Sequence, residues 1–304
     1  MTRLVFLGSP EAAVPTLELI ATRFEVGLVV TQPDRPRGRS GTPQPVPVKQ
    51  AALGLGLTVL QPETHEELQG TLEGSGPFDV GVVVAYGRIL RSESLAIPGA
   101  GMLNVHFSLL PRWRGAAPVS RALIEGDAMT GVTVIRLDEG LDTGPVLTAQ
   151  VIDIEAGENA GHLTERLARL GARLLVENLE PYLRGELVPV AQTGEGATYA
   201  SKLTRSDRTL SLEMSPTGFV NRVRGLAPSP GAILEIDGQD HKILAAEVDD
   251  IDVSPGTWKE GGGWPVVGLS RGSVRLASVQ SPGRGRVEGD AWLRGRQGRS
   301  GRVG

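Results

Sequence analysis

The sequence contains no cysteine, few aromatic residues and no long apolar run. Without cysteine, its 304 residues can form neither disulfides nor thiolate metal sites, and a cysteine nucleophile is excluded. No apolar stretch approaches the roughly 20 residues that a helix needs to cross a bilayer. The first residues reach Gly8 and Pro10 too early for a signal-peptide core, so we expect a strand there. These absences predict a cytoplasmic protein with no membrane partner.

The common signatures of nucleotide and zinc binding are missing as well. The turn Gly8-Ser-Pro10 lacks the second and third glycines of the dinucleotide fingerprint, and the sequence has no P-loop. His65-Glu-Glu67 does not continue into the zinc-binding helix pattern, and the four histidines are dispersed. We therefore expect no metal site.

Charge is distributed unevenly along the chain. Residues 1–200 carry 16 basic and 23 acidic side chains, whereas residues 201–304 carry 15 basic and 12 acidic ones. Eight arginines lie from Arg271 onward. A basic end on an acidic protein indicates either a polyanionic partner or a solvated tail.

The first part of the chain alternates short β-branched runs with helical patterns, which is typical of parallel strands joined by crossover helices. A long helix is expected within 159–183, where leucines recur at helical spacing. The expected strands are Leu4–Leu7, Gly27–Val30, Val80–Val84, Met102–His106 and Val132–Leu137. This pattern predicts an α/β fold with a doubly wound, mostly parallel sheet.

The pattern changes after Gly185. Residues 186–210 have little periodicity and are expected to connect two domains. One helix is then predicted at Pro216–Arg224, followed by short strands at Ala232–Ile236, Lys242–Val248, Pro265–Leu269 and Ser273–Val279. Short strands separated by glycine and proline predict a small β-barrel domain.

An irregular loop, Thr31–Val48, follows the second expected strand. It holds five prolines, two glycines and the arginines Arg35, Arg37 and Arg39. Long irregular loops in compact domains are usually functional or disordered, and the basic residues favour a phosphate-bearing partner.

The densest group of reactive residues closes the expected strand Met102–His106. Residues two apart on a strand face the same side, so Asn104 and His106 project together. An amide beside an imidazole suits a reaction through a tetrahedral oxyanion, which the amide can stabilise while the imidazole moves a proton. A strand-end capping amide and a satisfied buried histidine would give the same pattern.

A second group follows the strand Val132–Leu137, in Asp138-Glu-Gly-Leu-Asp142-Thr-Gly144. Its glycines allow a tight turn that brings a carboxylate close to a substrate. Asp142 can orient the imidazole or accept a proton from an attacking amine. An ordinary turn carboxylate without chemistry remains the alternative.

The stretch from Asn104 to Pro118 together with Gly140–Gly144 closely resembles the 10-formyltetrahydrofolate-dependent formyltransferases. Within that group, residues 31–39, 82–90 and 45–49 resemble the methionyl-tRNA formyltransferases. The resemblance covers nearly the whole chain. Phe107 departs from it, because many relatives carry a small residue there.

The resemblance implies a role for individual residues. Asn104, His106 and Asp142 match the catalytic residues. The implied folate contacts are Ser108, Leu109, Leu110, Pro111, Tyr86 and Gly87, and the implied tRNA contacts are Arg35, Arg37, Arg39 and Lys49. It also implies a catalytic domain (1–187), a linker (188–206) and an oligonucleotide-binding-type barrel that binds tRNA (207–304).

The implied reaction is transfer of the formyl group of 10-formyltetrahydrofolate to the amine of initiator methionyl-tRNA. Nothing in the sequence demands more than a monomer. Asn104 and His106 would stabilise the oxyanion, and Asp142 would orient the histidine and help to take the amine proton. Two other functions stay open. One is a formyltransferase for a small amine, such as a sugar nucleotide or a glycinamide, and the other is an RNA-binding protein with a relic catalytic domain.

Overall fold

The protein forms two compact units. A computed structural model describes residues 2–36, 41, 43–296 and 298–304. The first unit comprises Met1–Pro118, Met129–Asp153 and Thr164–Ala200, and the second comprises Val119–Ala128, Ile154–Leu163 and Ser201–Gly304. The units are discontinuous in sequence, since two short segments that lie between parts of the first unit in the sequence, 119–128 and 154–163, belong to the second unit. The division into domains at 187 and 207 stays a prediction.

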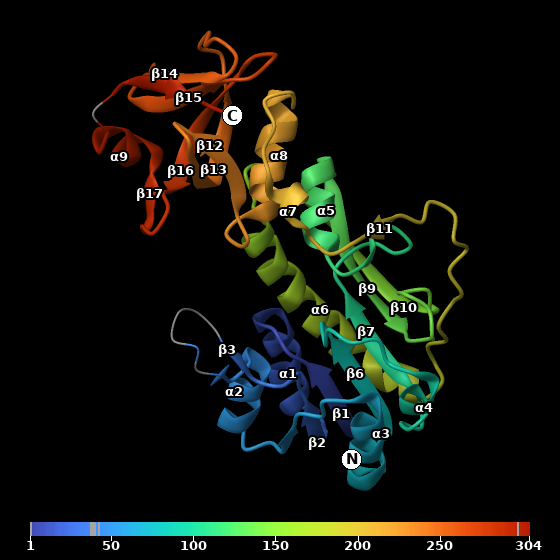
Figure 1. The fold of residues 1–304 in the computed structure, drawn as a ribbon. Coiled ribbons are helices and arrows are strands. Elements are labelled where there is room, and N and C mark those ends of the chain that lie inside the picture. The colour runs from blue at the N-terminus through green and yellow to red at the C-terminus, as the bar shows by residue number, and fades with distance from the viewer. Residues whose placement is uncertain (1, 37–40, 42, 297) are drawn as a thin grey trace. The chain divides into compact units, whose positions relative to one another are not determined.

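A seven-stranded sheet forms the centre of the first unit, in the order β10-β9-β7-β6-β1-β2-β5 (Figure 1). The strands are β1 (Arg3–Gly8), β2 (Glu25–Val30), β5 (Val59–Leu60), β6 (Val80–Val84), β7 (Met102–His106), β9 (Met129–Arg136) and β10 (Val146–Asp153). The five strands from β5 to β7 are parallel, as the alternating pattern predicted. Two short ribbons complete the unit, β3 (Arg35–Pro36) with β4 (Pro43–Gln44) and β8 (Arg114–Gly115) with β11 (Tyr199–Ala200).

Helices pack on both faces of this sheet, which confirms the predicted doubly wound class. They are η1 (Glu11–Ala13), α1 (Val14–Ala21), α2 (Pro47–Gly54), α3 (His65–Ser75), α4 (Ser92–Leu95) and most of α6 (Ala160–Leu183). On one face, Leu68 and Leu72 of α3 join the core that contains Val83 and Met102. On the other face α6 approaches closely, because a β-carbon at Gly171 would lie 2.5 Å from Val105 Cγ1. The sheet is therefore buried on both faces, as its nearly continuous apolar strands require.

The direction of β9 corrects the sequence prediction. Residues 132–137 were expected to form another parallel strand, but β9 runs antiparallel to β7, with His106 opposite Thr133. The unpredicted strand β10 then pairs antiparallel with β9. The helix between β7 and β9, residues 118–125, belongs almost wholly to the second unit. The connection is therefore not a crossover helix of the first unit, and β9 runs back antiparallel beside β7.

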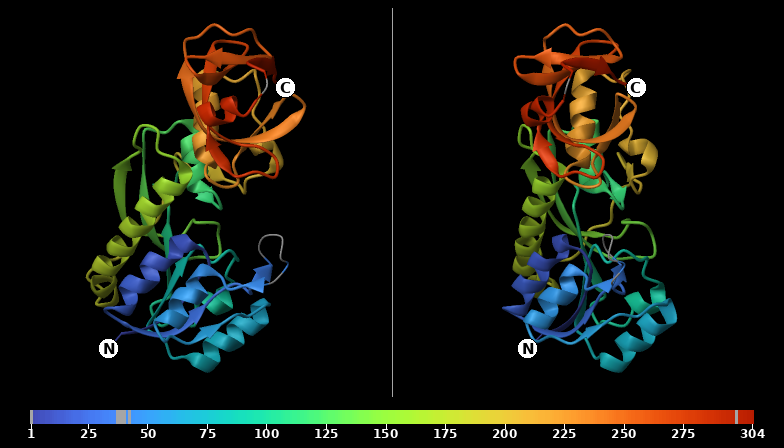
Figure 2. Two further views of the ribbon diagram at one scale, coloured as in Figure 1. Left: turned by 90° about the vertical axis from the view of Figure 1, so that its left-hand side faces the viewer. Right: turned by 60° about the vertical axis from the view of Figure 1, so that its left-hand side comes forward.

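The second unit contains a curled antiparallel sheet, visible in Figure 2. Its order is β12-β13-β16-β15-β14-β18, with β17 paired to β16. The strands are β12 (Ala232–Ile236), β13 (Gln239–Asp249), β14 (Thr257–Gly261), β15 (Trp264–Gly268), β16 (Ser273–Gln280), β17 (Arg286–Glu288) and β18 (Ser300–Arg302). A bridge between Ile236 and Val303 brings the end of the chain against β12. The sheet thus closes on itself, which confirms the predicted small barrel.

Four short helices belong wholly or largely to this unit. They are α5 (Pro118–Glu125), α7 (Arg205–Arg208), α8 (Pro216–Leu226) and α9 (Gly289–Arg294). Phe219 and Val223 of α8 are buried in one core with Trp258. A β-carbon at Gly225 would lie 2.9 Å from Ser120 O, so α5 packs tightly against α8. Over the described ranges of the chain, no helix is long and apolar enough to be a membrane span.

Candidate active site

Asn104 and His106 lie at the carboxyl end of β7. Val105 between them packs toward α6, so the alternation of the strand turns both polar side chains to the opposite face. Asn104 is partly buried, whereas His106 is only 6% exposed. Phe107 is buried, and its Cε1 would lie 3.7 Å from a β-carbon at Gly171 in α6. Its ring is therefore directed to the helix and away from the polar pair.

The Asp142 carboxylate lies between these two side chains. Its Oδ1 is 3.5 Å from Asn104 Nδ2, and its Oδ2 is 3.6 Å from His106 Nδ1. Both separations are at or beyond the limit of a hydrogen bond, so the groups face one another without being locked together. The Asp142 side chain is 12% exposed. The structure thus brings together the three residues that the sequence analysis selected.

Asp142 lies in the turn that follows β9, and this turn extends from the start of β7 back toward its carboxyl end. Because β9 is antiparallel to β7, the turn begins beside the start of β7, where Leu103 pairs with Arg136. Within the turn, Thr143 Oγ1 donates to both carboxylate oxygens of Asp138, at 2.8 and 3.0 Å. Gly144 is required, because a β-carbon there would lie 1.9 Å from Arg136 O.

A backbone carbonyl fixes the orientation of the His106 ring. His106 Nε2 lies 2.9 Å from Trp113 O. A carbonyl oxygen only accepts hydrogen bonds, so Nε2 must carry a proton there. The other nitrogen, Nδ1, consequently faces Asp142 and is the position at which the ring can exchange a proton.

Sequence reasoning missed four residues that surround the trio. Gly115 N donates to Asp142 Oδ2 at 2.8 Å, and Trp113 supplies the carbonyl for His106. Gln192 donates to the backbone of the Asp142 turn, and Thr198 Oγ1 accepts from Trp113 N at 2.9 Å. Gly115 was part of the quoted motif, but no local pattern marks Gln192 or Thr198. Both lie in the stretch that was expected only to connect two domains.

The segment predicted to contact folate follows His106 directly. The Ser108 hydroxyl is fully buried and donates to Arg112 O at 2.6 Å. Thr133 Oγ1 accepts from Leu110 N and donates to Ser108 O, so the segment is tied to β9. Leu109, Leu110 and Pro111 are partly exposed. A ligand would therefore meet these residues rather than the Ser108 hydroxyl, and the folate role of the segment stays a prediction.

Tyr86 and Gly87 follow β6 at the same edge of the sheet. Tyr86 is 2% exposed, burial raises the pKa of its phenol, and within the described part of the chain its hydroxyl has no hydrogen-bond partner. Gly87 is exposed and has a φ of +88°, a conformation that favours glycine. Their predicted contact with folate is not tested by these features.

The residues predicted to bind tRNA differ in their surroundings. Arg35 is exposed on the β3–β4 ribbon, and Arg37 and Arg39 lie outside the described residues. Lys49 on α2 is instead engaged within the chain, with Nζ at 2.6 Å from both Asp34 Oδ2 and Gln61 Oε1. The hydrogen bond from Lys49, followed by that from Gln61, lowers the pKa of Asp34.

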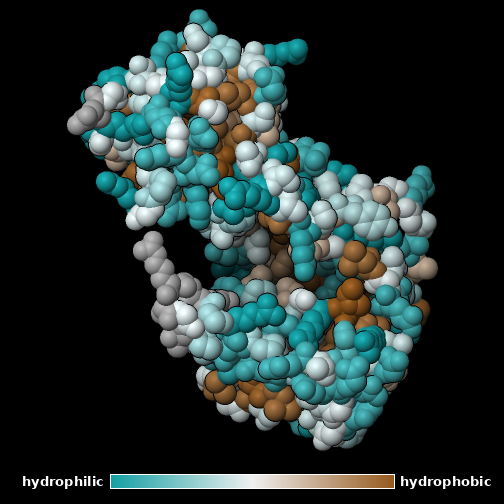
Figure 3. Space-filling model, viewed as in Figure 1, coloured by the Kyte–Doolittle hydropathy of each residue, from teal (hydrophilic) through white to brown (hydrophobic). Residues whose placement is uncertain are grey.

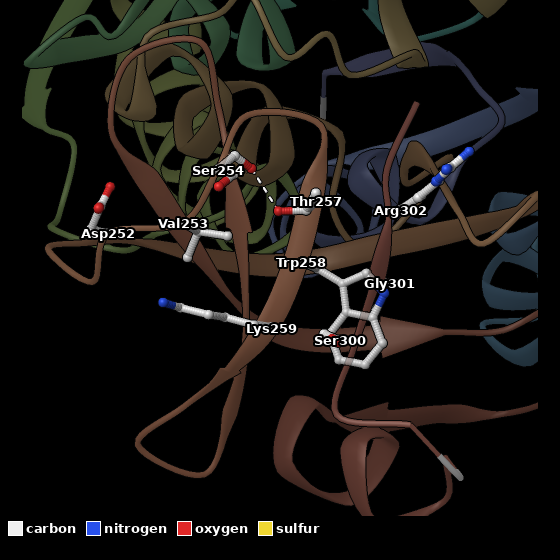
Figure 4. Close-up of a pocket in the computed structure, with 9 residues that line it drawn as sticks. All are labelled: Asp252, Val253, Ser254, Thr257, Trp258, Lys259, Ser300, Gly301 and Arg302. Carbon is white, nitrogen blue, oxygen red and sulfur yellow. Dashed lines mark hydrogen bonds between the residues drawn. The ribbon is translucent and has the colours of Figure 1, made fainter.

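A cavity of about 500 Å3 lies in the second unit, and none of the predicted site residues lines it. Figure 4 shows Lys259 and Arg302 extending in opposite directions from it, on either side of Trp258. Trp258 is 1% exposed and belongs to the core, so the cavity is a surface recess beside packed residues. Among the residues that the structure describes, no cluster of three or more histidine, aspartate or glutamate side chains could hold a metal.

Several large apolar side chains of the first unit are exposed, and Figure 3 shows brown groups on its surface. Ile89 is 71% exposed after β6, and Leu141, directly before Asp142, is 51% exposed. Exposed apolar residues beside polar reactive groups are typical of ligand sites.

Comparison with protein families assigns both parts of the chain. Residues 3–179 match the formyl transferase family, and residues 202–297 match the formyl transferase C-terminal domain. Methionyl-tRNA formyltransferase from Aromatoleum aromaticum is 43% identical over 297 residues, which cover 96% of this chain and 94% of the relative. The same enzyme from Halorhodospira halophila is 49% identical over 247 residues, covering 80% of this chain and 79% of the relative.

Solved structures share the fold at lower identity. The N-formyltransferase from Helicobacter canadensis, in complex with folinic acid and dTDP-3-aminofucose, matches with a TM-score of 0.70 and 17% identity, over 91% of this chain and 99% of that one. HypX from Aquifex aeolicus, in complex with tetrahydrofolic acid, matches with a TM-score of 0.68 and 16% identity. That match covers 96% of this chain and 46% of HypX, so the chain spans about half of HypX. By its sequence and its fold, the chain belongs to the formyltransferase family, and within it to the methionyl-tRNA formyltransferases.

Proposed function

We propose that this chain transfers the formyl group of 10-formyltetrahydrofolate to the free amine of initiator methionyl-tRNA, and that Asn104, His106 and Asp142 carry out the chemistry. The observation that carries the proposal is the position of the Asp142 carboxylate, 3.5 Å from the Asn104 amide and 3.6 Å from the His106 imidazole. A donor, a proton carrier and an acceptor thus meet at one strand end. The named relatives support methionyl-tRNA as the acceptor.

The reaction begins when the lone pair of the amine attacks the formyl carbon and the carbonyl electron pair moves onto oxygen. Asn104 Nδ2 has two hydrogens, and the long contact to Asp142 leaves at least one of them for that oxyanion. A well-placed donor of this kind lowers the barrier by about 3–4 kcal/mol.

The proton released by the amine passes to the pair formed by His106 and Asp142. His106 Nε2 is committed to the Trp113 carbonyl, so Nδ1 takes the proton and the adjacent carboxylate stabilises the imidazolium. With a proton on Nδ1 the ring can also donate to the oxyanion. The carbon–nitrogen bond to the folate then breaks, and the folate nitrogen takes up the proton, so charge and protons balance.

We assign recognition of the tRNA to the ribbon that carries Arg35 and to the basic part of the chain after residue 200. Arg35 is exposed, and the residues after 200 contain more basic than acidic side chains. Phosphate contacts of this kind position a nucleic acid and weaken as salt concentration rises.

A single assay tests the proposal. The protein is given methionyl initiator tRNA, a set of small amines and formyl-folate labelled in the formyl group, and the label is followed into RNA, small amines and free formate. We expect it on the RNA, with kcat falling by about 100- to 1,000-fold in Asn104→Ala and similarly in His106→Ala. Label only on a small amine would make the chain a small-molecule formyltransferase, and near-normal transfer by either variant would overturn the residue assignment.

A further inference from the structure

We propose that Gln192 is a positioning residue for Asp142, and that it acts from a strap, residues 190–200, which holds both sides of the catalytic trio. The inference rests on the proposed function, because it assigns a role within the same site. It also gives a function to a stretch in which the sequence shows little periodicity.

The amide of Gln192 brackets the Asp142 turn. Its Nε2 donates to Asp142 O at 2.9 Å and to Gly144 O at 2.7 Å. An amide nitrogen has two hydrogens, and here each one serves one carbonyl. Asp142 has a φ of +53°, a conformation that side-chain-bearing residues rarely adopt. The two hydrogen bonds hold the turn in this unfavourable conformation, which directs the carboxylate to Asn104 and His106.

Arg114 fixes which way the Gln192 amide points. Arg114 Nη2 donates to Gln192 Oε1 at 2.6 Å, and the arginine is only 7% exposed. A guanidinium only donates, so the oxygen of the amide must face Arg114 and its nitrogen must face the turn. Among the described residues the Arg114 Nε has no hydrogen-bond partner, so this buried cation depends strongly on its contact with Gln192.

The other end of the strap holds the carbonyl that orients His106. Thr198 Oγ1 accepts from Trp113 N at 2.9 Å, and Thr198 O accepts from Arg114 N at 2.9 Å. Trp113 has a φ of +63°, and its carbonyl accepts the Nε2 proton of His106. One segment therefore fixes both the carboxylate and the ring that face each other across 3.6 Å.

Pairing at both ends keeps the strap in place. Val190 exchanges two backbone hydrogen bonds with Val146, at 2.7 and 2.8 Å. At the other end, Ala200 pairs with Gly115 in the β8–β11 ribbon. A β-carbon at Gly115 would lie 2.8 Å from Ala200 O, so only glycine allows this approach. Gly115 is also the residue whose amide donates to Asp142.

Gln192→Glu tests the proposal most sharply. The glutamate has nearly the same size and can still accept from Arg114, but its carboxylate has no hydrogen to donate to the two carbonyls. Misplacing a catalytic group by about 1 Å costs up to about 100-fold in rate, so we expect kcat to fall by about 10- to 100-fold. The KM for tRNA and for formyl-folate should change less than about threefold, and the pH profile of kcat should shift, because the geometry of Asp142 and His106 has changed.

Three further variants make the test decisive. Gln150→Glu, on the exposed edge strand β10, makes the same chemical change away from the site and should retain the parental kcat. If Gln192→Glu does not fold, Gln192→Ala is used in its place, and we expect the same shifts in kcat and in the pH profile. In the Asp142→Asn background, Gln192→Glu should add less than about twofold to the loss, because both changes act through one carboxylate.

The outcomes separate this inference from the proposed function. If Asp142→Asn keeps near-normal transfer, the assignment of the site fails, and the role of Gln192 fails with it. If Asp142→Asn is inactive while Gln192→Glu has the parental kcat and pH profile, only the present inference is overturned. Gln192→Glu could instead lower both kcat and thermal stability, leave the pH profile unchanged and add its full loss to that of Asp142→Asn. That result would also overturn the inference, because it would show that Gln192 has a structural role only.

Discussion

Two irregular segments of the first unit follow strands, and they differ in how firmly hydrogen bonds hold them and in how exposed their charged side chains are. The Asp142 turn, residues 137–145, is tied inward by hydrogen bonds to Gln192, Gly115 and its own Thr143. The Pro- and Arg-rich loop, residues 31–48, forms a short ribbon whose described arginine, Arg35, is exposed. A carboxylate that handles a proton must be held in place, whereas a basic loop that meets a large polyanion must remain accessible.

The base of the Pro- and Arg-rich loop is held by hydrogen bonds, as the Asp142 turn is. Lys49, Asp34 and Gln61 form a hydrogen-bonded cluster between the end of the loop and the strand β5 region. Lys49 and Asp34 are 23% and 22% exposed, so their contact is partly shielded from water. The loop is therefore anchored at its base although the described Arg35 is exposed.

The largest effect is expected from Gly144→Ala in the Asp142 turn. The new β-carbon would collide with Arg136 O, so the turn would move and carry Asp142 with it. We expect kcat to fall by at least about 100-fold in steady-state formyl transfer, with a smaller change in KM. The matched control is Gly54→Ala in α2, where a β-carbon meets nothing within 4 Å. Equal activity of the two alanine variants would contradict the role of the turn.

A smaller effect of another kind is expected from Arg35→Ala in the loop. Loss of one phosphate contact should raise the KM for tRNA by several-fold and leave kcat and the KM for formyl-folate nearly unchanged. The slope of log KM against log salt should fall by about 0.7 to 0.9. Arg23→Ala, an exposed arginine just after α1, is the control. If both variants change the salt dependence alike, the loop has no specific role in binding tRNA.

The smallest effect is expected from Lys49→Met at the base of the loop. Hydrogen bonds from Lys49 and Gln61 lower the pKa of Asp34, so the folded protein favours the ionised carboxylate. The resulting stability is present above the ordinary pKa of aspartate, near 4, and is lost as the pH falls through the lowered value. We expect the variant to lose about 1 kcal/mol at pH 7, because the pair is partly exposed.

Calorimetry between pH 3 and pH 8 measures this difference. The gap between the parental protein and Lys49→Met should shrink as the pH falls below about 4. Lys202→Met, at an exposed lysine, serves as the control and should show no such pH dependence. A gap that stays constant down to pH 3 would show that the carboxylate of Asp34 does not contribute.

Local patterns predicted much of the fold. The boundaries of β6, β7 and β12 agree with the sequence, because each strand is a short run of mostly apolar residues. The helix α6 begins one residue after the predicted start and ends at Leu183, since its leucines define one apolar face. Within the two large sheets the strands β5, β10, β14, β17 and β18 were missed, and so were the two-residue strands β3, β4, β8 and β11. The missed strands are exposed or short, so their apolar pattern is weak, and they form because a neighbouring strand is available.

The candidate site could be predicted only in part. Asn104 and His106 share a face because of strand alternation, which is a local property of the sequence. The expectation that Asp142 joins them proved right, although β9 runs in the direction opposite to the expected one. The surrounding groups could not be found, because they act through backbone atoms or through Gln192, 50 residues from Asp142 in the chain.

The sequence by itself determined which chemical groups are present, which of them share a strand, and that the chain consists of an α/β part followed by a basic β-rich part. Periodicity and turn residues carry this information, because each depends only on neighbours along the chain. The tertiary structure alone decided the direction of β9, the nitrogen of His106 that faces Asp142 and the position of the strap. These features depend on hydrogen bonds between residues far apart in sequence, which become favourable only when folding has excluded water from both partners.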